Sequence, residues 1–441
     1  MKKSALTALT LALYFVGCGS SDITTDVVQT PVVEVPPTEV VKATPGSPLK
    51  MSGTTARRSA SVSVDEITSL TQGNNEFALS LYQQLNVDNN TQNLVFSPHS
   101  ISVAFSMLYA GSANETSEEL VSTFHYDLPL EEHHQAFNSL DQKLTGAAND
   151  ENFQLSIVNA QWGEKSYPFN TDYVDTLGEF YGADLFLADF VNLPDKEREY
   201  INNWVAIQTN DLIKDLLPEG SINNTARFVL TNAVYFKASW ETPFPAERTL
   251  DRTFYFIDKS EKQIPTMQLK FDTHLYQTDG QTIVELPYKN TQWSMYLLHT
   301  DVGNFHTMDG NLTAPYLDEM INKMEMAEID LRMPKFSLMS GLDLQTALKK
   351  LGLNFAFEPS QADFSLMNEN NEMGLFVQGA FHKAFIEVNE EGTEAGAATG
   401  LVVGTTLAAL PVFLNSPFVF IIRHKETGAI LFMGKVLDPT S

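Results

Sequence analysis

A run of small side chains near the C-terminal end limits how this chain can fold more than any other feature. Residues 390–399 read EEGTEAGAAT, and their alternate side chains from position 393 onward are small and uncharged. Alternate residues of a strand share one face, so this segment could enter between two existing strands without burying a charge. We therefore predict an insertion hinge made of Glu390, Glu391, Gly392, Thr393, Glu394, Ala395, Gly396, Ala397, Ala398 and Thr399.

The alternation continues beyond the hinge. If Thr393 faces inward, the inward positions that follow include Leu401, Val403 and Thr405. The outward positions hold the charge of Glu394, and Val402 is their one bulky aliphatic side chain. The segment as far as Thr406 therefore fits a strand that inserts without burying a charge.

The composition favours a large globular body and argues against polyanionic partners. Of 441 residues, 43% are hydrophobic and 29 are Phe, which is enough for a sizeable core. Only 28 Lys and Arg stand against 55 Asp and Glu, for a net charge of -27. Proteins that bind nucleic acid concentrate basic residues on one face. We expect neither nucleic acid nor a glycosaminoglycan as a partner, and no cofactor.

The N-terminal segment carries the single cysteine of the chain, Cys18, which excludes an intrachain disulfide and a multi-cysteine metal site. Two lysines precede an apolar stretch at 5–16 that is too short to span a bilayer in the usual way. Segment 1–18 is similar to a bacterial lipoprotein signal, which implies that Cys18 is lipidated after cleavage. An ordinary secretory signal is the alternative, and Phe15 departs from the lipoprotein pattern, where Leu is more usual.

Residues 19–64 are rich in Thr, Val, Pro and Ser and lack helical or strand periodicity. We predict a disordered tether with a root-mean-square span of roughly 40 Å, followed by a folded domain at 65–441. We expect the protein to be secreted across the inner membrane and lipid-anchored at the outer membrane or cell surface. The protein would be extracellular if the tether is cleaved, and the lipid is the expected membrane contact.

The folded part mixes helices and strands. Helical spacing covers 66–85, Ser97 and Pro98 have the form of an N-cap followed by a first-turn proline, and Thr116 begins a capping-box pattern. Strand-like runs lie at 154–162, 227–236, 282–287, 294–299, 327–333, 379–388 and 418–423. Helices precede strands and then interleave with them irregularly, which predicts an α+β fold.

Motifs of common enzymes are absent from the sequence. The chain has no Gly-x-Ser-x-Gly elbow, no His-Glu-x-x-His and no glycine-rich phosphate loop. The adjacent His133 and His134 would diverge by about 100° on a helix, so we interpret them as part of a solvated helix face rather than a metal site. We expect no catalytic residues, no metal ion and no enzymatic activity.

Six segments match one known family in the family's own order. They are NLVFSP at 93–98, LYAG at 108–111, TNAVYFKASW at 231–240, HKA at 382–384, VFLNSPFVF at 412–420 and LFMGKV at 431–436. In these segments the chain resembles the serpins, serine protease inhibitors that work by conformational change. The resemblance covers about residues 65–439.

The resemblance implies one serpin domain of about nine helices and three β-sheets, with an exposed reactive-centre loop at about 390–411. Its five-stranded main sheet would accept this loop as an extra strand. The resemblance also implies a polar cluster that controls opening of the sheet, with an aromatic residue at the point of insertion. The matching residues are Ser97, Ser100, Asn232 and His382 for the cluster and Trp240 for the aromatic residue. We expect a monomer.

The resemblance further implies irreversible suicide inhibition of an extracellular serine protease. The protease cleaves the loop, forms an acyl-enzyme and is trapped covalently as the loop inserts. Family spacing places the reactive bond between Thr406 and Leu407, and a small β-branched residue before the cut suits elastase-like or subtilisin-like enzymes. Alternatives are cleavage after Leu407 by a chymotrypsin-like enzyme and inhibition of papain-like cysteine proteases. A serpin-fold surface protein that binds without inhibiting is the alternative function.

Overall fold

A computed structural model describes residues 48–54, 56–59, 61–88, 90–146, 149–150, 153–278, 280–289, 292–393 and 409–440. The α-helices of these residues are α1 (Val64–Asp88), α2 (Pro98–Tyr109), α3 (Asn114–Phe124), α4 (Leu130–Thr145), α5 (Thr171–Thr176), α6 (Pro194–Gln208), α7 (Phe305–Gly310), α8 (Ala314–Asn322) and α9 (Gln345–Lys350). Short helices of other types are η1 (Leu177–Tyr181), η2 (Ala246–Arg248), η3 (Val302–Asn304), η4 (Phe355–Phe357) and η5 (Ser365–Met367).

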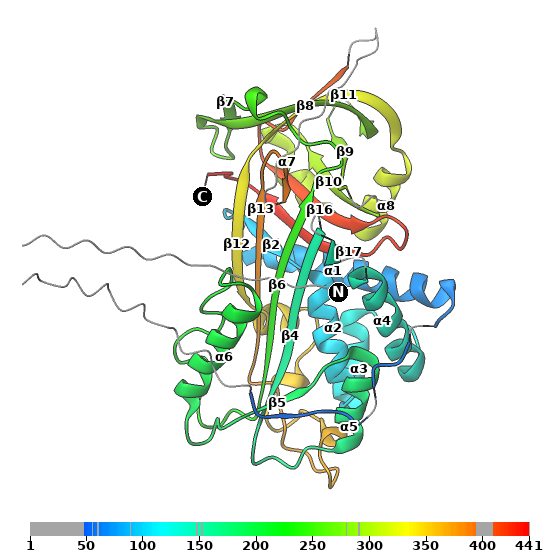
Figure 1. The fold of residues 1–441 in the computed structure, drawn as a ribbon, viewed down its shortest axis with the longest axis vertical. Coiled ribbons are helices and arrows are strands. Elements are labelled where there is room, and N and C mark those ends of the chain that lie inside the picture. Colours follow the sequence, from blue (N-terminus) through cyan, green and yellow to red (C-terminus); the bar gives the residue numbers. More distant parts are fainter. Residues whose placement is uncertain are drawn as a thin grey trace, which may run out of the picture. The chain divides into compact units, whose positions relative to one another are not determined.

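The main sheet runs lengthwise through Figure 1. Its order is β1 (Lys50–Met51), β5 (Leu185–Ala188), β4 (Phe153–Glu164), β6 (Phe228–Ser239), β13 (Gly379–Val388) and β12 (Phe336–Asp343). Two short strands pair beside this path, β3 (Asn149–Asp150) with β4 and β14 (Gly392–Thr393) with β6. The central strands β6 and β13 are parallel, whereas β4 and β6 are antiparallel.

The second sheet has the order β15 (Leu410–Phe413), β11 (Glu325–Pro334), β8 (Glu261–Gln277), β9 (Thr282–Pro287), β10 (Trp293–His299), β16 (Phe418–His424), β17 (Ile430–Val436) and β2 (Leu94–Phe96), with β7 (Leu250–Tyr255) beside β8. The described strands thus join into two sheets, not the three expected. The reason is the length of β8, which has 17 residues. Its first residues pair with β7, its long middle part pairs with β11, and its last three residues pair with β9.

The faces of the main sheet are covered by different helices. Helix α2 is buried along its whole length and contacts β4 and β6 on one face. On the other face α6 contributes Ile201 and Val205 to a separate apolar cluster with Ala233 of β6 and Phe381 of β13. Helix α6 therefore belongs to the layer that covers this second face of the main sheet.

The predicted α+β class and all seven predicted strands are confirmed, with boundaries that shift by up to three residues. The Ser97 hydroxyl oxygen accepts a hydrogen bond from the Ser100 amide, as expected for the N-cap of α2. The predicted capping box at Thr116 is wrong, because α3 begins at Asn114 without a side-chain cap. The Thr116 hydroxyl instead accepts a hydrogen bond from the Asp363 amide.

The interpretation of His133 and His134 as a solvated helix face is also wrong, since both side chains are buried. Helix α4 is covered on two sides, so diverging directions still lead into protein. His133 lies 2.7 Å from the Ser106 hydroxyl of α2, and His134 lies 2.6 Å from the Tyr181 hydroxyl of η1. Burial lowers the pKa of both imidazoles, that of His134 to about 4.

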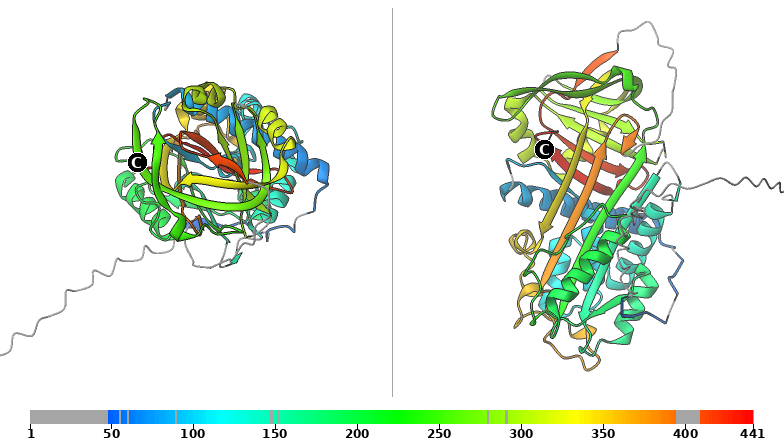
Figure 2. Two further views of the ribbon diagram at one scale, coloured as in Figure 1. Left: turned by 90° about the horizontal axis from the view of Figure 1, so that it is seen from above. Right: turned by 60° about the vertical axis from the view of Figure 1, so that its left-hand side comes forward.

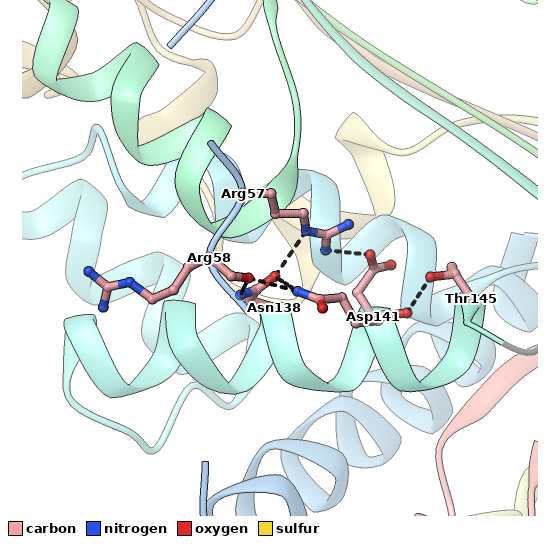
Figure 3. Close-up of polar contacts among 6 residues, drawn as sticks. Arg57, Arg58, Asn138, Asp141 and Thr145 are labelled. Atoms are coloured by element: carbon pink, nitrogen blue, oxygen red, sulfur yellow. Dashed lines mark hydrogen bonds and ion pairs between the residues drawn. The ribbon is translucent and has the colours of Figure 1, made fainter. Parts of the chain in front are cut away.

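Residues 48–54 and 56–59 pack against the folded body, although the sequence predicted a disordered tether as far as residue 64. Strand β1 pairs with the edge strand β5, and Arg57 and Arg58 cross the helix α4 (Figure 3). Arg57 donates to the Asn138 amide oxygen at 2.9 Å and pairs with Asp141 at 2.7 Å. We call residues 48–54 and 56–59 the strap. These long-range polar contacts supply order that no local periodicity in the strap could indicate.

Replacement of Asn138 tests the strap. Asn138 is 2% exposed, and its amide nitrogen donates to the Arg58 carbonyl at 2.9 Å. Asn138→Ala should lower the unfolding free energy by about 1–3 kcal/mol, because it leaves buried polar partners unsatisfied. The control Lys143→Ala removes an exposed ion pair to Glu426 and should change it by less than about 1 kcal/mol. Urea unfolding measures both, and equal losses would contradict the assigned role of the strap.

Candidate functional site

The chain reverses direction directly after β13. The Asn389 amide donates to the Gly392 carbonyl at 2.9 Å, and β14 then pairs antiparallel with the end of β6. Gly392 lies opposite Ser239 and Thr393 lies opposite Ala238. The first residues of the predicted hinge therefore already form two residue pairs with the main sheet, on the edge of β6 that faces β13.

Gly392 has no room for a larger residue. Its φ is +156°, and a Cβ atom at this position would lie 2.1 Å from the Ala238 carbonyl oxygen. A real Cβ does not approach a backbone oxygen so closely, so any side chain here would push β14 away from β6. Glycine at this place is required by the close approach of two backbones.

The side chain of Thr393 points into the protein. It is fully buried, and its hydroxyl lies 3.1 Å from the Tyr288 hydroxyl. The Tyr288 ring stacks on Trp240 at 4.6 Å, and the Trp240 indole N–H donates to the Asn389 carbonyl at 3.0 Å. Trp240 thus packs beneath the turn where the hinge meets the sheet, as the resemblance implied for an aromatic residue at the point of insertion.

Glu390 ties the hinge to neighbouring strands. Its carboxylate pairs with Lys335 at 2.8 Å and accepts a hydrogen bond from Thr249 at 2.7 Å. Burial opposes ionisation of this carboxyl, but the bonds from Lys335 and Thr249 outweigh it and lower the pKa of Glu390. The backbone carbonyls of Glu390 and Glu391 accept from the amides of Phe244 and Trp240.

The predicted polar cluster is assembled across the centre of the main sheet. Asn232 of β6 stands in register with His382 of β13 and with Asn159 of β4. Ser97 and Ser100, from the first turn of α2, lie beneath them: the Ser97 amide donates to His382 Nε2 at 3.1 Å, and Asn232 donates to the Ser100 hydroxyl at 2.6 Å. The cluster therefore bridges β6 and β13.

The hydrogen bonds determine the protonation state of His382. Because the Ser97 amide donates to Nε2, the ring proton sits on Nδ1 and is donated to the Asn232 amide oxygen. No acceptor remains for a second ring proton, and the ring is fully buried. Burial lowers the pKa of His382 to about 3.

This pKa predicts acid sensitivity. As the pH falls below about 6.5, the unfolded chain takes up a proton at His382 that the folded chain excludes until about pH 3, so folding stability falls. The loss from this residue should be about 2 kcal/mol between pH 8 and pH 5. His382→Gln should remove about that much of the difference in unfolding free energy between pH 8 and pH 5. His306→Gln, at an exposed position, should leave this difference unchanged. Equal pH profiles for His382→Gln and the parent would contradict this account.

The structure adds three residues that sequence reasoning missed. Asn159 accepts from Ser100 at 2.9 Å, Tyr288 contacts Thr393, and Lys335 holds Glu390. An asparagine is unusual in the middle of a strand, so Asn159 could have been flagged in the run 154–162. Residues 394–399, Thr406, Leu407 and Cys18 lie outside the described residues.

A family model described as "Serpin (serine protease inhibitor)" matches residues 72–439. Leukocyte elastase inhibitor A of Mus musculus is 36% identical over 384 residues, which cover 84% of this chain and 99% of that protein. An uncharacterized serpin-like protein of Methanosarcina acetivorans is 33% identical over 371 residues, covering 83% and 85%. The chain belongs to the serpin family.

Solved structures agree with this assignment. The native state of tengpin, a thermophilic serpin, superposes with a TM-score of 0.78 at 26% identity and covers 88% of this chain and 97% of that one. Uncleaved ovalbumin superposes with a TM-score of 0.77 at 26% identity, covering 84% and 100%. The protein is therefore a protease inhibitor of the serpin fold rather than an enzyme, and serpins form covalent complexes with their target proteases.

Among the described residues, no cluster of three or more His, Cys, Asp and Glu side chains is arranged to hold a metal ion. None of the helices in this part of the chain combines the length and the apolar character needed to cross a membrane.

Proposed function

We propose that the protein is an irreversible suicide-substrate inhibitor of extracellular serine proteases of elastase-like or subtilisin-like specificity. The observation that carries this proposal is the pairing of Gly392 and Thr393 with β6, on the edge that faces β13. The hinge stands at the head of a junction between two parallel strands, and an antiparallel strand can fit between parallel neighbours. The sheet would then gain ladder bonds on both sides of the new strand.

Register shows how far the loop could enter. Continuing the pairing of Thr393 with Ala238 would bring Val403 opposite Phe228, the first residue of β6. That inserted stretch spans ten residue steps (403 minus 393), or about 33 Å at roughly 3.3 Å per residue. The whole inward set from Thr393 to Val403 is then uncharged.

The intact loop is too short for this movement. From Val403 to Leu410 there are seven residue steps, which reach at most about 25 Å. Yet β15 is paired with β11 at the same end of the body as the hinge (Figures 1 and 2). Full insertion therefore requires either a cut in the loop or release of β15, and cleavage by a protease supplies the cut.

Insertion must also disrupt the junction between β6 and β13. The bond between His382 and Asn232 crosses this junction, and Ala233 of β6 and Phe381 of β13 share one apolar cluster on the other face of the sheet. Since these contacts must break before new ones form, they contribute to the barrier that keeps the loop outside the sheet. Ser97, Ser100, Asn159, Asn232 and His382 are accordingly assigned to control of sheet opening.

We assign the reactive bond to Thr406 and Leu407 on family spacing. A small residue before the cut fits a shallow apolar pocket, and the name of one similar protein, leukocyte elastase inhibitor A, agrees with an elastase-like target.

We also propose that the protein is exported and anchored through a lipid on Cys18. Labelling of the parent chain, but not of Cys18→Ser, by radioactive palmitate would support the anchor.

The inhibitory function is tested by mixing the protein with pancreatic elastase. A covalent complex that survives boiling in detergent should form, with a mass near the sum of the two chains. The matched control is elastase whose active-site serine is replaced by alanine, which should bind without forming this complex. Complete cleavage of the loop by active elastase and subtilisin, with no complex in either mixture, would show that the protein is a substrate and not an inhibitor.

A further inference from the structure

A pocket of about 120 Å³ lies where β7 and β11 meet the chain that follows β15. Two arginines line it, Arg252 from β7 and Arg332 from β11. Apolar contact surface comes from Phe254, Phe413 and Leu414. The pocket thus combines two cations with apolar walls, in a chain whose net charge is -27.

Each arginine is fixed by a polar partner through one terminal nitrogen. Arg252 donates to Gln268 at 2.9 Å and Arg332 pairs with Asp330 at 3.0 Å, while Gln268 donates to Asp330 at 2.6 Å. Arg332 also lies over the Phe413 ring at 4.2 Å. One carboxylate in this network faces two guanidinium groups, so one positive charge remains in excess.

Both arginines keep an unused donor. The Nε atoms of Arg252 and Arg332 are buried and have no hydrogen-bond partner among the described residues. A buried N–H group without an acceptor is uncommon in folded proteins and costs stability. The two guanidinium groups therefore retain hydrogen-bonding capacity that the described residues do not use.

We propose that this pocket binds a small monocarboxylate with an aromatic or short aliphatic body. Guanidinium groups bind planar carboxylates through paired, charge-assisted hydrogen bonds, and the apolar walls accommodate the body of the ligand. The volume is close to that of a cavity of about 150 Å³ that holds benzene. A fully hydrated inorganic anion would leave the apolar walls without contacts.

The site is placed to act on the distal end of the reactive loop. The Leu414 amide donates to the Arg332 carbonyl at 2.8 Å, and the Tyr255 amide donates to the Asn415 carbonyl at 2.8 Å. The segment that follows β15 therefore spans from β11 to β7 along the pocket. A carboxylate held by both arginines joins the same two strands, so it secures β15 against the release that insertion of an uncleaved loop requires.

Benzoate is the probe, and benzamide is its uncharged control of the same shape. Titration calorimetry on the full chain should show one saturable benzoate site, at least tenfold tighter than benzamide. Arg252→Met and Arg332→Met should each weaken benzoate binding at least tenfold, whereas Arg248→Met, at an exposed arginine just before β7, should not. Arg252→Met leaves the ion pair of Asp330 and Arg332 intact, so it keeps the test informative if Arg332→Met folds poorly.

Amide hydrogen exchange tests the effect on the loop. Saturating benzoate should slow exchange of the Leu414 and Tyr255 amides at least threefold in the parent and leave both unchanged in Arg252→Met. Equal binding of benzoate and benzamide, absence of a saturable site, or benzoate binding that survives both substitutions would overturn the carboxylate site. Tight benzoate binding without slower exchange at Leu414 would overturn its coupling to β15. Neither outcome depends on whether elastase is the target.

Discussion

Thr393→Arg should convert the inhibitor into a substrate. Thr393 is already fully buried beside Tyr288 where the hinge joins β6, so an arginine at this position would displace the hinge from β6 and place a charge at the start of the insertion path. Burying an unpaired charge costs several kcal/mol, and each 1.4 kcal/mol slows a step about tenfold. Insertion should therefore become at least a hundredfold slower, and hydrolysis of the acyl-enzyme should occur first.

The measurement is the number of inhibitor molecules consumed for each elastase molecule inhibited. It should rise at least tenfold for Thr393→Arg, with cleaved inhibitor accumulating in place of the covalent complex. Thr393→Val is the matched control, since it keeps the shape of threonine and adds no charge. Its yield of covalent complex should stay within about twofold of the yield from the parent. An unchanged complex yield for Thr393→Arg would contradict the role of this position in insertion.

Cleavage of the loop should stabilise the protein strongly. A strand inserted between β6 and β13 adds on the order of ten hydrogen bonds at about 1 kcal/mol each. For a domain of this size, about 10 kcal/mol corresponds to a rise of about 10 °C or more in melting temperature. Differential scanning calorimetry before and after limited cleavage within 400–408 gives the value directly.

The control for this measurement is the same cleavage in Thr393→Arg. The cut chain should then gain much less stability relative to its own uncut form, because the charged residue opposes insertion, and the uncut form should melt below the parent because position 393 is already buried. A parent protein that melts at the same temperature before and after cleavage would favour the non-inhibitory serpin-fold alternative. Melting thus separates the two functions without knowledge of the physiological protease.

Local patterns predicted much of the fold. The spacing of apolar residues indicated α1 over 66–85, and Ser97 with Pro98 indicated the start of α2. The strand at 379–388 was predicted with its observed bounds. These predictions succeeded because helix and strand periods, and the chemistry of caps, depend on residues a few positions apart.

Other features depend on residues that lie far apart in the chain. His133 and His134 were interpreted as solvated because adjacent positions on a helix diverge by about 100°, yet α2 and η1 cover both imidazoles. The strap looked like part of a tether, but Asn138 and Asp141 of α4 hold Arg57 in place (Figure 3). In both cases the partner that decides burial is encoded elsewhere in the sequence.

By itself, the sequence determined that the hinge is made of small, uncharged alternate residues and that its motifs match those of the serpins. Only the tertiary structure decided that Gly392 must lack a side chain, since the clash would come from the Ala238 carbonyl. Likewise, His382 and Asn232 are 150 positions apart and meet because β13 and β6 pair in one register. Composition specifies what a strand can accept, whereas register between distant strands specifies which atoms come into contact.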